Sequence, residues 1–540
     1  MMRPLILLSL FFCAFRISAQ EVIMPAEFEK NEGILLKWNY NASVDSTVAR
    51  IASIISPGDK VWMLYDPANS FTLTAIQAQL SARGANLANI TFMEGVAENP
   101  WLRDYGPLAG YSVDTASETR RLVDAQYNAG LSPLADFLPF QLAMGFNYDY
   151  DVMPLNFEGG NLLLDGIGRG FVSDRVLTQN PDKNKYQVIQ TIYTKLSLNE
   201  TIILPSVPEC GGGEWSELSR LVKIIDSETV LVSQFPSSVP YYNKIELLAD
   251  SLSKTFNDVG RYFKVYRLPV AANDDGNYAS SNNGVIRSYT SALVINNKIL
   301  IPFYNKPTDA VALNVYKQVF PGYQLYQVPA QVLANMHGSL YRLAVNIPQT
   351  KLFRIRHSKM IGMKPFENEV WINTFVQCIG SVDSIQLYYR IHPSPVYLPV
   401  ITFGCCGGYS AAINGFSIGD TVSYYIKGYQ GNFSNTLPIA APETVYTFWF
   451  DPFTGIKTSA KEEVSVFPNP NRGIVFIKGI KQFSADATYQ LTSLGGIRVA
   501  EGKISRDAVI HLPDYLNNGF YIIKLVNSGK TNVSKLYLHR

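Results

Sequence analysis

The chain has few cysteines and few charges for its length. It contains five cysteines among 540 residues, which is too few for a fold that depends on disulfides. Charged residues make up 17% of the chain, whereas about 25% is typical of globular proteins. The net charge is only +2, which argues against binding through a basic surface. We therefore expect no nucleic-acid partner.

Long hydrophobic runs are also missing. The first apolar run, Leu5–Phe15, follows Arg3 and is followed by Ile17, Ser18 and Ala19. A membrane-spanning helix needs about 20 apolar residues, so this run is too short to cross a bilayer. A short apolar core with an early cation and a small residue at its end is typical of a secretory signal peptide. The sequence thus predicts a signal peptide at residues 1–19 and no transmembrane segment.

Aromatic residues and short strands are abundant. The 32 Tyr and 29 Phe favour strand-rich structure, because aromatic side chains suit pleated, half-buried surfaces. Apolar runs such as Lys60–Tyr65 and Lys298–Phe303 alternate with amphipathic stretches such as Val48–Ile55. This alternation predicts ββα-type units, and hence an α/β domain over residues 20–363.

The pattern changes after residue 364. Val370–Cys378, Ser384–Ile391 and Asp420–Tyr429 are alternating or aromatic segments without helical periodicity. They predict a β-sandwich of immunoglobulin type at residues 364–450, followed by a polar linker at 451–463. In an oxidising compartment Cys378 is able to pair with either Cys405 or Cys406, and the sequence leaves that choice open.

Residues 464–540 form a third unit rich in Pro, Asn and Gly turns, which predicts a small all-β module. It opens with Phe467-Pro468-Asn469-Pro470 and continues to Asn518-Gly519-Phe520-Tyr521 and Lys535–Leu538. This order of motifs resembles the C-terminal sorting domain of type IX secretion. The resemblance implies that the chain is exported through the periplasm to the cell surface or the medium, with the type IX machinery as a partner.

Two segments of the first domain carry candidate binding residues. Trp101, Arg103 and Asp104 lie in the segment WLRDYGP, which ends in Gly-Pro and reads as a tight loop that fixes Asp104. A buried carboxylate is unfavourable unless it is paired or used, although a structural Arg103–Asp104 pair also fits. The second segment is FEGGN, with Glu158, Gly159, Gly160 and Asn161. Its glycines permit close approach of the backbone to a ligand, and an ordinary glycine turn also explains them.

Two further segments, Cys210–Ser219 and His337–Arg342, match no nucleophile elbow, phosphate loop or zinc motif. The first domain has only two histidines, His337 and His357, which excludes a histidine-rich metal site. We expect neither a metal nor another cofactor.

These segments, in this order, resemble the agmatine deiminase and bacterial peptidylarginine deiminase family. The likeness begins at Met24–Glu29, passes through WLRDYGP and FEGGN, and extends to Ala312–Tyr323. It implies a fivefold pseudo-symmetric α/β propeller, the pentein fold, followed by two all-β domains. It also implies hydrolysis of a guanidino group to a ureido group and ammonia, by a cysteine nucleophile, a proton-shuttling histidine and carboxylates that hold the cation. The implied partner is an arginine-containing peptide or a small guanidino compound.

The family's residues carry over only in part. The resemblance implies Asp104 as a catalytic carboxylate, with substrate-binding roles for Trp101, Arg103, Asp104, Glu158, Gly159, Gly160 and Asn161. The family's His-x-Asp motif falls on Glu217-Leu218-Ser219, and its cysteine falls on Arg342. An arginine cannot act as the nucleophile, and it repels a cationic substrate by about 4 kcal/mol at ~4 Å and an effective dielectric of ~20.

We therefore predict that the family reaction is lost or very weak, and that the Arg342 guanidinium fills the old pocket and pairs with Asp104 or Glu158. Two alternatives remain. The chain is an active guanidino hydrolase that uses Cys210 as nucleophile and His337 as base, or it is an adhesin-like surface module.

Overall fold

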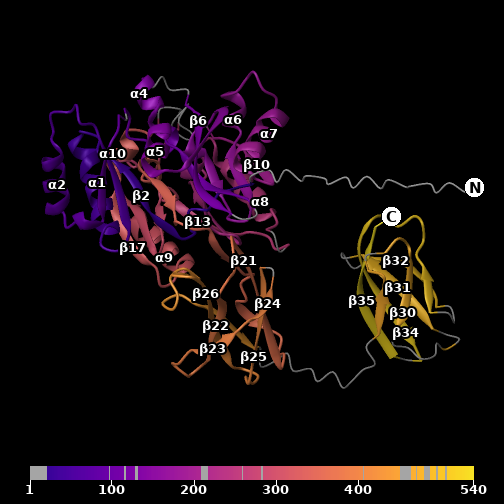
Figure 1. The fold of residues 1–540 in the computed structure, drawn as a ribbon. Helices are drawn as coiled ribbons and strands as arrows, with labels where there is room; N and C mark the ends of the chain where they lie inside the picture. Colours follow the sequence, from indigo (N-terminus) through magenta and orange to yellow (C-terminus); the bar gives the residue numbers. More distant parts are fainter. Residues whose placement is uncertain are drawn as a thin grey trace, which may run out of the picture. The chain divides into compact units, whose positions relative to one another are not determined.

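The structure is a computed structural model, shown in Figure 1. Its chain divides into two compact units, Met1–Phe450 and Asp451–Arg540. The expected signal peptide, Cys210 and the expected linker lie outside the described residues. The structure describes residues 21–539 except 97, 115–116, 128–131, 208–216, 258–259, 281–283, 406, 451–463, 470, 479–483, 485–486, 494–496, 505–507 and 529.

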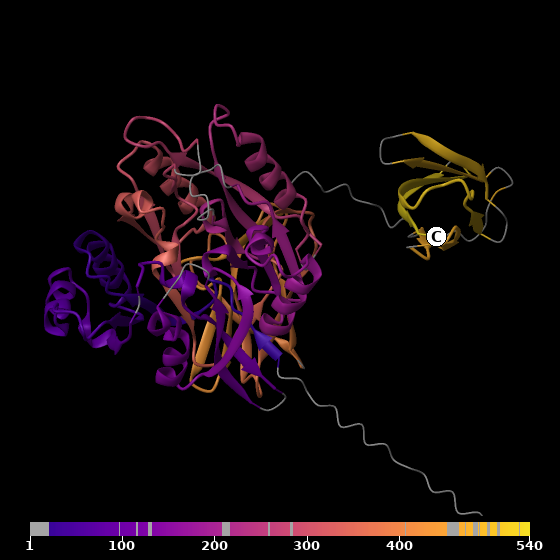
Figure 2. The ribbon, with the colours of Figure 1, turned by 90° about the horizontal axis from the view of Figure 1, so that it is seen from above.

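Five sheets of the same topology build most of the first unit. In each sheet two antiparallel strands are followed by a helical segment and by a third strand parallel to the second. Figure 2 shows the segments following one another around a common centre, with helices on the outside. This is the predicted fivefold α/β propeller, or pentein fold.

The sheets are made of short strands. They are β18 (Val345–Pro348), β2 (Asn31–Lys37), β3 (Lys60–Tyr65) and β4 (Ile90–Glu94); β1 (Glu21–Ile23), β5 (Leu108–Val113), β6 (Glu118–Gln126) and β7 (Asp149–Asn156); β8 (Leu162–Leu164), β9 (Arg169–Ser173) and β10 (Glu200–Leu204); β11 (Val222–Asp226), β12 (Thr229–Gln234), β13 (Lys264–Ala271) and β14 (Arg287–Ser288); and β15 (Leu293–Ile295), β16 (Lys298–Phe303) and β17 (Gln324–Pro329).

The ring of sheets is closed by strands from the two ends of the propeller sequence. Strand β18 pairs antiparallel with β2, which places Val345 opposite Leu35. The last strand of the propeller therefore supplies the first strand of its first sheet.

The helices pack on the sheets through amphipathic faces. In α1 the side chain of Asn41 caps the first turn by accepting from the amides of Ser43 and Val44. Val48 and Ile51 of that helix are completely buried. The helices of the first unit are α1 (Ala42–Ile55), α2 (Leu73–Ala82), α3 (Leu102–Tyr105), α4 (Pro133–Asp136), α5 (Leu138–Phe146), α6 (Arg175–Thr178), α7 (Lys185–Leu196), α8 (Tyr242–Ser253), α9 (Thr308–Val319) and α10 (Gln331–Asn335).

A β-sandwich follows the propeller within the first unit. Along β21 (Glu369–Cys378) alternate side chains are buried between the two sheets of the sandwich, among them Val370 and Ile372. One sheet contains β19 (Phe353–Arg356), β21, β25 (Gly408–Asn414) and β24 (Phe403–Cys405); the other contains β20 (Gly362–Lys364), β28 (Tyr446–Phe450), β26 (Thr421–Gln430), β22 (Ser384–Ile391), β23 (Leu398–Ile401) and β27 (Phe433–Leu437).

Strand β19 already pairs with the sandwich strand β21, so this sheet begins before residue 364, the boundary expected from the sequence. Cys378 forms no disulfide with another described residue, and its Sγ lies 3.7 Å from the carbonyl oxygen of Gly380. Cys406 and the side chain of Cys405, its expected partners, lie outside the described residues, and the disulfide stays a prediction.

The second unit has an all-β core of its own, in which Val475, Leu491, Ile523 and Leu536 are completely buried. In the part of the chain that the structure describes, no helix has both the length and the apolar character needed to cross a membrane. The strands of the second unit are β29 (Ser465–Phe467), β30 (Ile474–Lys478) and β33 (Val509–His511) in one sheet, and β32 (Arg498–Lys503), β31 (Thr488–Ser493), β34 (Gly519–Asn527) and β35 (Lys530–Leu538) in the other.

Candidate functional site

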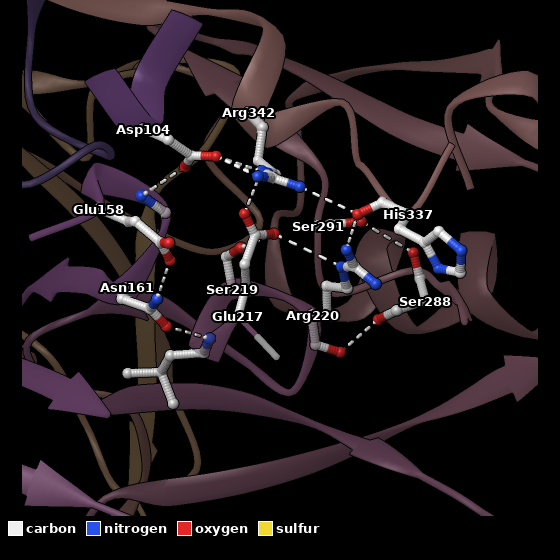
Figure 3. A network of polar contacts seen from close by, with 12 residues as sticks. Asp104, Glu158, Asn161, Glu217, Ser219, Arg220, Ser288, Ser291, His337 and Arg342 are labelled. Atoms are coloured by element: carbon white, nitrogen blue, oxygen red, sulfur yellow. Dashed lines mark hydrogen bonds and ion pairs between the residues drawn. The ribbon is translucent and has the colours of Figure 1, made fainter. Parts of the chain in front are cut away.

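The candidate site is built from four short helical turns, each of which directly precedes a strand of a different sheet. Helix α3 precedes β5, and the 3-10 turns η2 (Gly159–Asn161), η5 (Leu218–Arg220) and η6 (Tyr341–Leu343) precede β8, β11 and β18. These turns contact one another near the centre of the propeller. The fivefold repeat thus brings together residues that are up to 238 positions apart in sequence. Figure 3 shows the resulting polar network.

The Arg342 guanidinium occupies the middle of this network. Its side chain is completely buried and makes ion pairs with Asp104 and Glu217. Its Nε donates to Asp104 Oδ2 at 2.5 Å, and its Nη1 donates to the carbonyl oxygen of His337 at 2.9 Å. The Trp101 ring lies over the guanidinium, 4.8 Å from Cζ. A protein arginine is therefore held by two carboxylates and an aromatic face, as a bound guanidinium ligand would be.

Of the two carboxylates expected as alternative partners of Arg342, Asp104 is the one that pairs with it, and Glu217 is a second partner that was not expected. The Arg342–Asp104 pair is present, whereas the second carboxylate on Arg342 is Glu217 rather than Glu158. The Glu158 carboxylate instead accepts from Arg175 at 3.1 Å and Gln179 at 3.2 Å through Oε1.

The other oxygen of Glu158 organises the neighbouring turn. Glu158 Oε2 accepts from Asn161 Nδ2 at 2.8 Å, and Asn161 Oδ1 accepts from the backbone amide of Leu218 at 2.9 Å. Glu158 and Asn161 therefore connect η2 to η5, the turn that follows Glu217, and both are brought to the site.

Three glycines let the turns approach closely. A Cβ on Gly159 would lie 2.2 Å from the Arg103 carbonyl oxygen, and one on Gly160 would lie 2.7 Å from Glu217 Oε1. A Cβ on Gly338 would lie 1.9 Å from the Trp101 ring. The FEGGN glycines were expected to admit a ligand, but the groups that approach them in the structure belong to the protein itself.

Arg103 faces away from the Arg342 cluster. Its Nε donates to the Tyr341 carbonyl oxygen at 2.7 Å, its Nη2 donates to Asn346 Oδ1 at 2.8 Å, and its guanidinium lies 3.8 Å from the centroid of the Tyr341 ring. The described residues show no Arg103–Asp104 ion pair, so the proposed staple between these neighbours is replaced by contacts that brace η6.

Sequence reasoning missed Arg220, which is almost completely buried beside Arg342. Its Nη2 donates to the His337 carbonyl oxygen, so two guanidinium groups share one acceptor. Its Nε lies 3.5 Å from Glu217 Oε2. The sequence pattern that could have identified Arg220 is its spacing of three residues from Glu217, because this spacing places a charge pair on one face of a helical turn. His337 adopts a left-handed backbone conformation with φ of 56°.

Burial shifts the pKa values of Glu217 and Glu158. Burial raises the pKa of Glu217 to about 7; the positive charges of Arg342 and Arg220 oppose this, and the carboxylates of Asp104 and Glu158 add to it. Burial and the nearby Asp104 likewise raise the pKa of Glu158. Burial alone would lower the pKa of Arg342, but the charges of Asp104 and Glu217 outweigh it and raise that pKa above its ordinary value.

Of the residues expected to carry a reaction, the structure describes Asp104, which lies in the cluster, and His337, whose carbonyl oxygen accepts from Arg342. Ser219 Oγ lies 3.5 Å from Glu217 Oε2, and Cys210 lies outside the described residues. Within the described ranges, no cluster of three or more His, Cys, Asp or Glu side chains is arranged to hold a metal ion.

A five-sheet propeller with a carboxylate-lined guanidinium site at its centre defines a pentein of the deiminase class. Residues 23–348 match the family described as Porphyromonas-type peptidyl-arginine deiminase, and the chain belongs to that family. Residues 465–539 match the secretion system C-terminal sorting domain, a type IX sorting domain that implies secretion or export to the cell surface.

Individual relatives agree with this family. A provisionally named agmatine deiminase of Yersinia pestis is 25% identical over 362 residues, which cover 60% of this chain and 95% of that protein. The fold is similar to that of the agmatine deiminase of Enterococcus faecalis, with a TM-score of 0.53 at 19% identity over 61% of this chain and 96% of that chain. It is also similar to a substrate-bound agmatine deiminase of C. jejuni, with a TM-score of 0.52 at 17% identity over 61% and 97% of the two chains.

Proposed function

We propose that this chain is an exported, catalytically inactive deiminase-family protein that acts as a binding module at the cell surface or in the medium. The observation that carries this proposal is the buried Arg342, whose guanidinium is paired with Asp104 and Glu217. In this proposal the Arg342 side chain fills the pocket in which the family binds its substrate. The propeller then serves as a scaffold.

Three substitutions support the loss of the reaction. The family's cysteine position holds Arg342, and its His-x-Asp positions hold Glu217 and Ser219. Arg342 stays protonated and lacks nucleophilic character. Without an imidazole at position 217 the site also lacks the base that would move protons between the attacking group, water and the leaving ammonia.

The occupied pocket opposes substrate entry as well. A guanidino substrate would have to displace Arg342 from two carboxylates, and separating one partner of such a buried pair costs about 3–5 kcal/mol. We infer that arginine peptides and small guanidino compounds are excluded from the cluster.

We also infer that the chain is exported through the periplasm. Residues 1–19 would direct it into the periplasm, and residues 464–540 would direct it across the outer membrane.

An ammonia-release assay on the mature chain tests the proposal. Agmatine, free arginine and an arginine-containing peptide are each incubated with the protein beside an active agmatine deiminase as positive control, and we expect no product above the buffer rate. Ammonia release that the Cys210→Ala variant abolishes would overturn the proposal in favour of a relocated nucleophile.

A second experiment tests whether restoring the family's residues restores the reaction. The triple variant Arg342→Cys, Glu217→His, Ser219→Asp returns all three family groups, and we expect it to gain slow ammonia release from agmatine or an arginine peptide. The single variant Arg342→Cys, which lacks the base, is the matched control and should stay inactive. Equal activity of the two variants would contradict the assigned roles of positions 217 and 219.

A further inference from the structure

A second cavity lies in the first unit, at the opposite end of the propeller strands from Arg342. Strands β8 and β11 begin beside the Arg342 cluster and run to hairpin turns at residues 165–168 and 227–228. Residues of these turns line a cleft of about 850 Å³ whose other wall is the β-sandwich. Asp104, Glu217 and Arg342 are absent from its lining. The volume is in the range of small-molecule sites, which occur preferentially where domains meet.

Aromatic and apolar side chains form much of the cleft wall. Tyr266 of β13 and Phe320 contribute from the propeller, while Phe375 of β21 and Tyr446 of β28 contribute from the sandwich. Such walls offer flat faces for stacking against a ring or a compact apolar body.

The carboxylates of the cleft are already neutralised. Four acidic residues line it, and each makes an ion pair with an arginine or lysine, so none is left to attract a cationic ligand. The pairs are Glu29 with Arg354, Asp165 with Arg169, Asp226 with Lys359, and Glu228 with Arg261.

Four cations of the cleft, Lys30, Lys264, Arg356 and Lys427, have no such partner among the described residues, and two of them lie beside aromatic rings that also line it. Within the described part of the chain, neither Lys264 of the propeller nor Arg356 of the sandwich makes an ion pair. Each lies beside an aromatic ring instead: Lys264 Nζ is 4.8 Å from the centroid of Tyr266, and Arg356 Cζ is 5.2 Å from the centroid of Phe375. Both residues line the cleft, so positive charge faces it from both domains.

The same region contains buried polar atoms that lack hydrogen bonds. Arg356 Nε and the hydroxyl of Thr374 are both buried without a hydrogen-bond partner among the described residues. Thr374 also lines the cleft, and its side chain is only 4% exposed. Buried donors are nearly always satisfied in folded proteins, and both of these atoms are able to donate to an acceptor in the cleft.

We propose that this cleft binds a small organic carboxylate with an aromatic or cyclic apolar body. The carboxylate accepts from Arg356 and is attracted by Lys264, while the ring stacks between the aromatic walls. The inference does not depend on the proposed loss of catalysis, because the residues of the Arg342 cluster take no part in it.

Isothermal titration of the mature full-length chain with 2-naphthoate tests the proposal. Its neutral amide, 2-naphthamide, and the cation 2-naphthylmethylamine serve as matched ligands of similar shape. We expect measurable binding of the carboxylate and at least about tenfold weaker binding of the other two, since a charge-assisted hydrogen bond is lost. The variants Arg356→Gln and Lys264→Gln should each weaken 2-naphthoate binding by about tenfold.

The exposed residues Arg50 and Lys185 provide charge-matched controls, and Arg50→Gln and Lys185→Gln should leave binding unchanged. The melting temperature of each unliganded variant shows whether its fold is intact. If Arg356→Gln does not fold, Lys264→Gln and Phe375→Ala carry the test. Absence of 2-naphthoate binding, equal binding of the amide, or an equal loss in the control variants would overturn the proposal.

Discussion

Arg342 Nε donates to Asp104 Oδ2 at 2.5 Å inside a completely buried ion pair. The two residues come from turns before β18 and β5, and Glu217 of a third turn completes the enclosure of the guanidinium. The guanidinium held by these carboxylates thus belongs to the protein itself, and the ion pairs are a structural contact.

Removal of the Arg342 side chain should convert this contact back into a binding site. Arg342→Ala leaves Asp104 and Glu217 buried without their cation, and we expect a loss of about 3–5 kcal/mol in the free energy of unfolding. Guanidinium ion at concentrations too low to denature should then raise the melting temperature of the variant, because the emptied carboxylate pocket exists only in the folded state. Differential scanning calorimetry measures both effects.

The matched control is Arg50→Ala, since Arg50 is exposed. It should neither destabilise the protein nor respond to guanidinium, and tetramethylammonium should fail to stabilise Arg342→Ala. A variant as stable as the wild type would contradict the energetic importance of the pair.

Glu217 should make stability depend on pH. Its pKa is raised by burial from 4.5 to about 7, so folding takes up a proton between these values. The stabilisation from this proton is full below pH 4.5 and is lost as the pH rises through 7. Relative to Glu217→Gln, the wild type should lose on the order of 3 kcal/mol of unfolding free energy across this window.

Urea denaturation of both proteins at pH 4.5 and 7.5 measures this difference. Glu369→Gln alters an exposed carboxylate of β21 and serves as the control, for which no comparable change is expected. A constant difference between wild type and Glu217→Gln at the two pH values would show that Glu217 does not titrate in this range.

Gly338 should tolerate no larger residue. A Cβ at this position would lie 1.9 Å from the Trp101 ring, which covers Arg342, so Gly338→Ala must displace the ring or the loop. We expect a loss of about 1–3 kcal/mol, as for other overpacked sites. Gly145→Ala, whose Cβ would meet only the end of Met93 at 3.2 Å, should be neutral or stabilising in α5. Thermal unfolding compares the two, and equal melting temperatures would contradict the tight packing.

Deletion of residues 464–540 should stop export at the periplasm in a host with type IX secretion. The full chain should reach the medium or the cell surface, whereas the truncated chain should accumulate behind the outer membrane with its first unit folded. Immunoblots of periplasmic, surface and medium fractions measure this. The control is the double variant Lys185→Gln, Arg50→Gln, which should be exported normally; export of the truncated chain would contradict the assigned role of the second unit.

Much of the propeller was predictable from local patterns. The apolar runs Lys60–Tyr65 and Lys298–Phe303 coincide with β3 and β16, because strands covered on both faces appear as continuous apolar segments. Asp104 was singled out because a charged pair between aromatic residues, followed by Gly-Pro, indicates a tight loop that fixes the carboxylate. Its contact with Arg342 was predicted because the resemblance places Arg342 at the family's cysteine position.

The remaining features depend on distant contacts. Arg220 matters because it donates to the carbonyl oxygen of His337, more than a hundred residues away, and no local pattern reports such an acceptor. The choice of Glu217 over Glu158 as the second partner of Arg342 depends on how η2 and η5 approach each other. Arg175 and Gln179, which hold Glu158, carry no sequence signal that connects them to it.

The pairing of Val345 with Leu35 has a consequence for folding and for fragments of the protein. The first sheet is incomplete until β18 is available, so ring closure must wait for one of the most sequence-distant contacts in the unit, and contacts of this kind slow folding. A fragment that ends before residue 345 leaves the edge of β2 without its partner strand. Because unpaired edges template association with other chains, such fragments should aggregate rather than persist as smaller propellers.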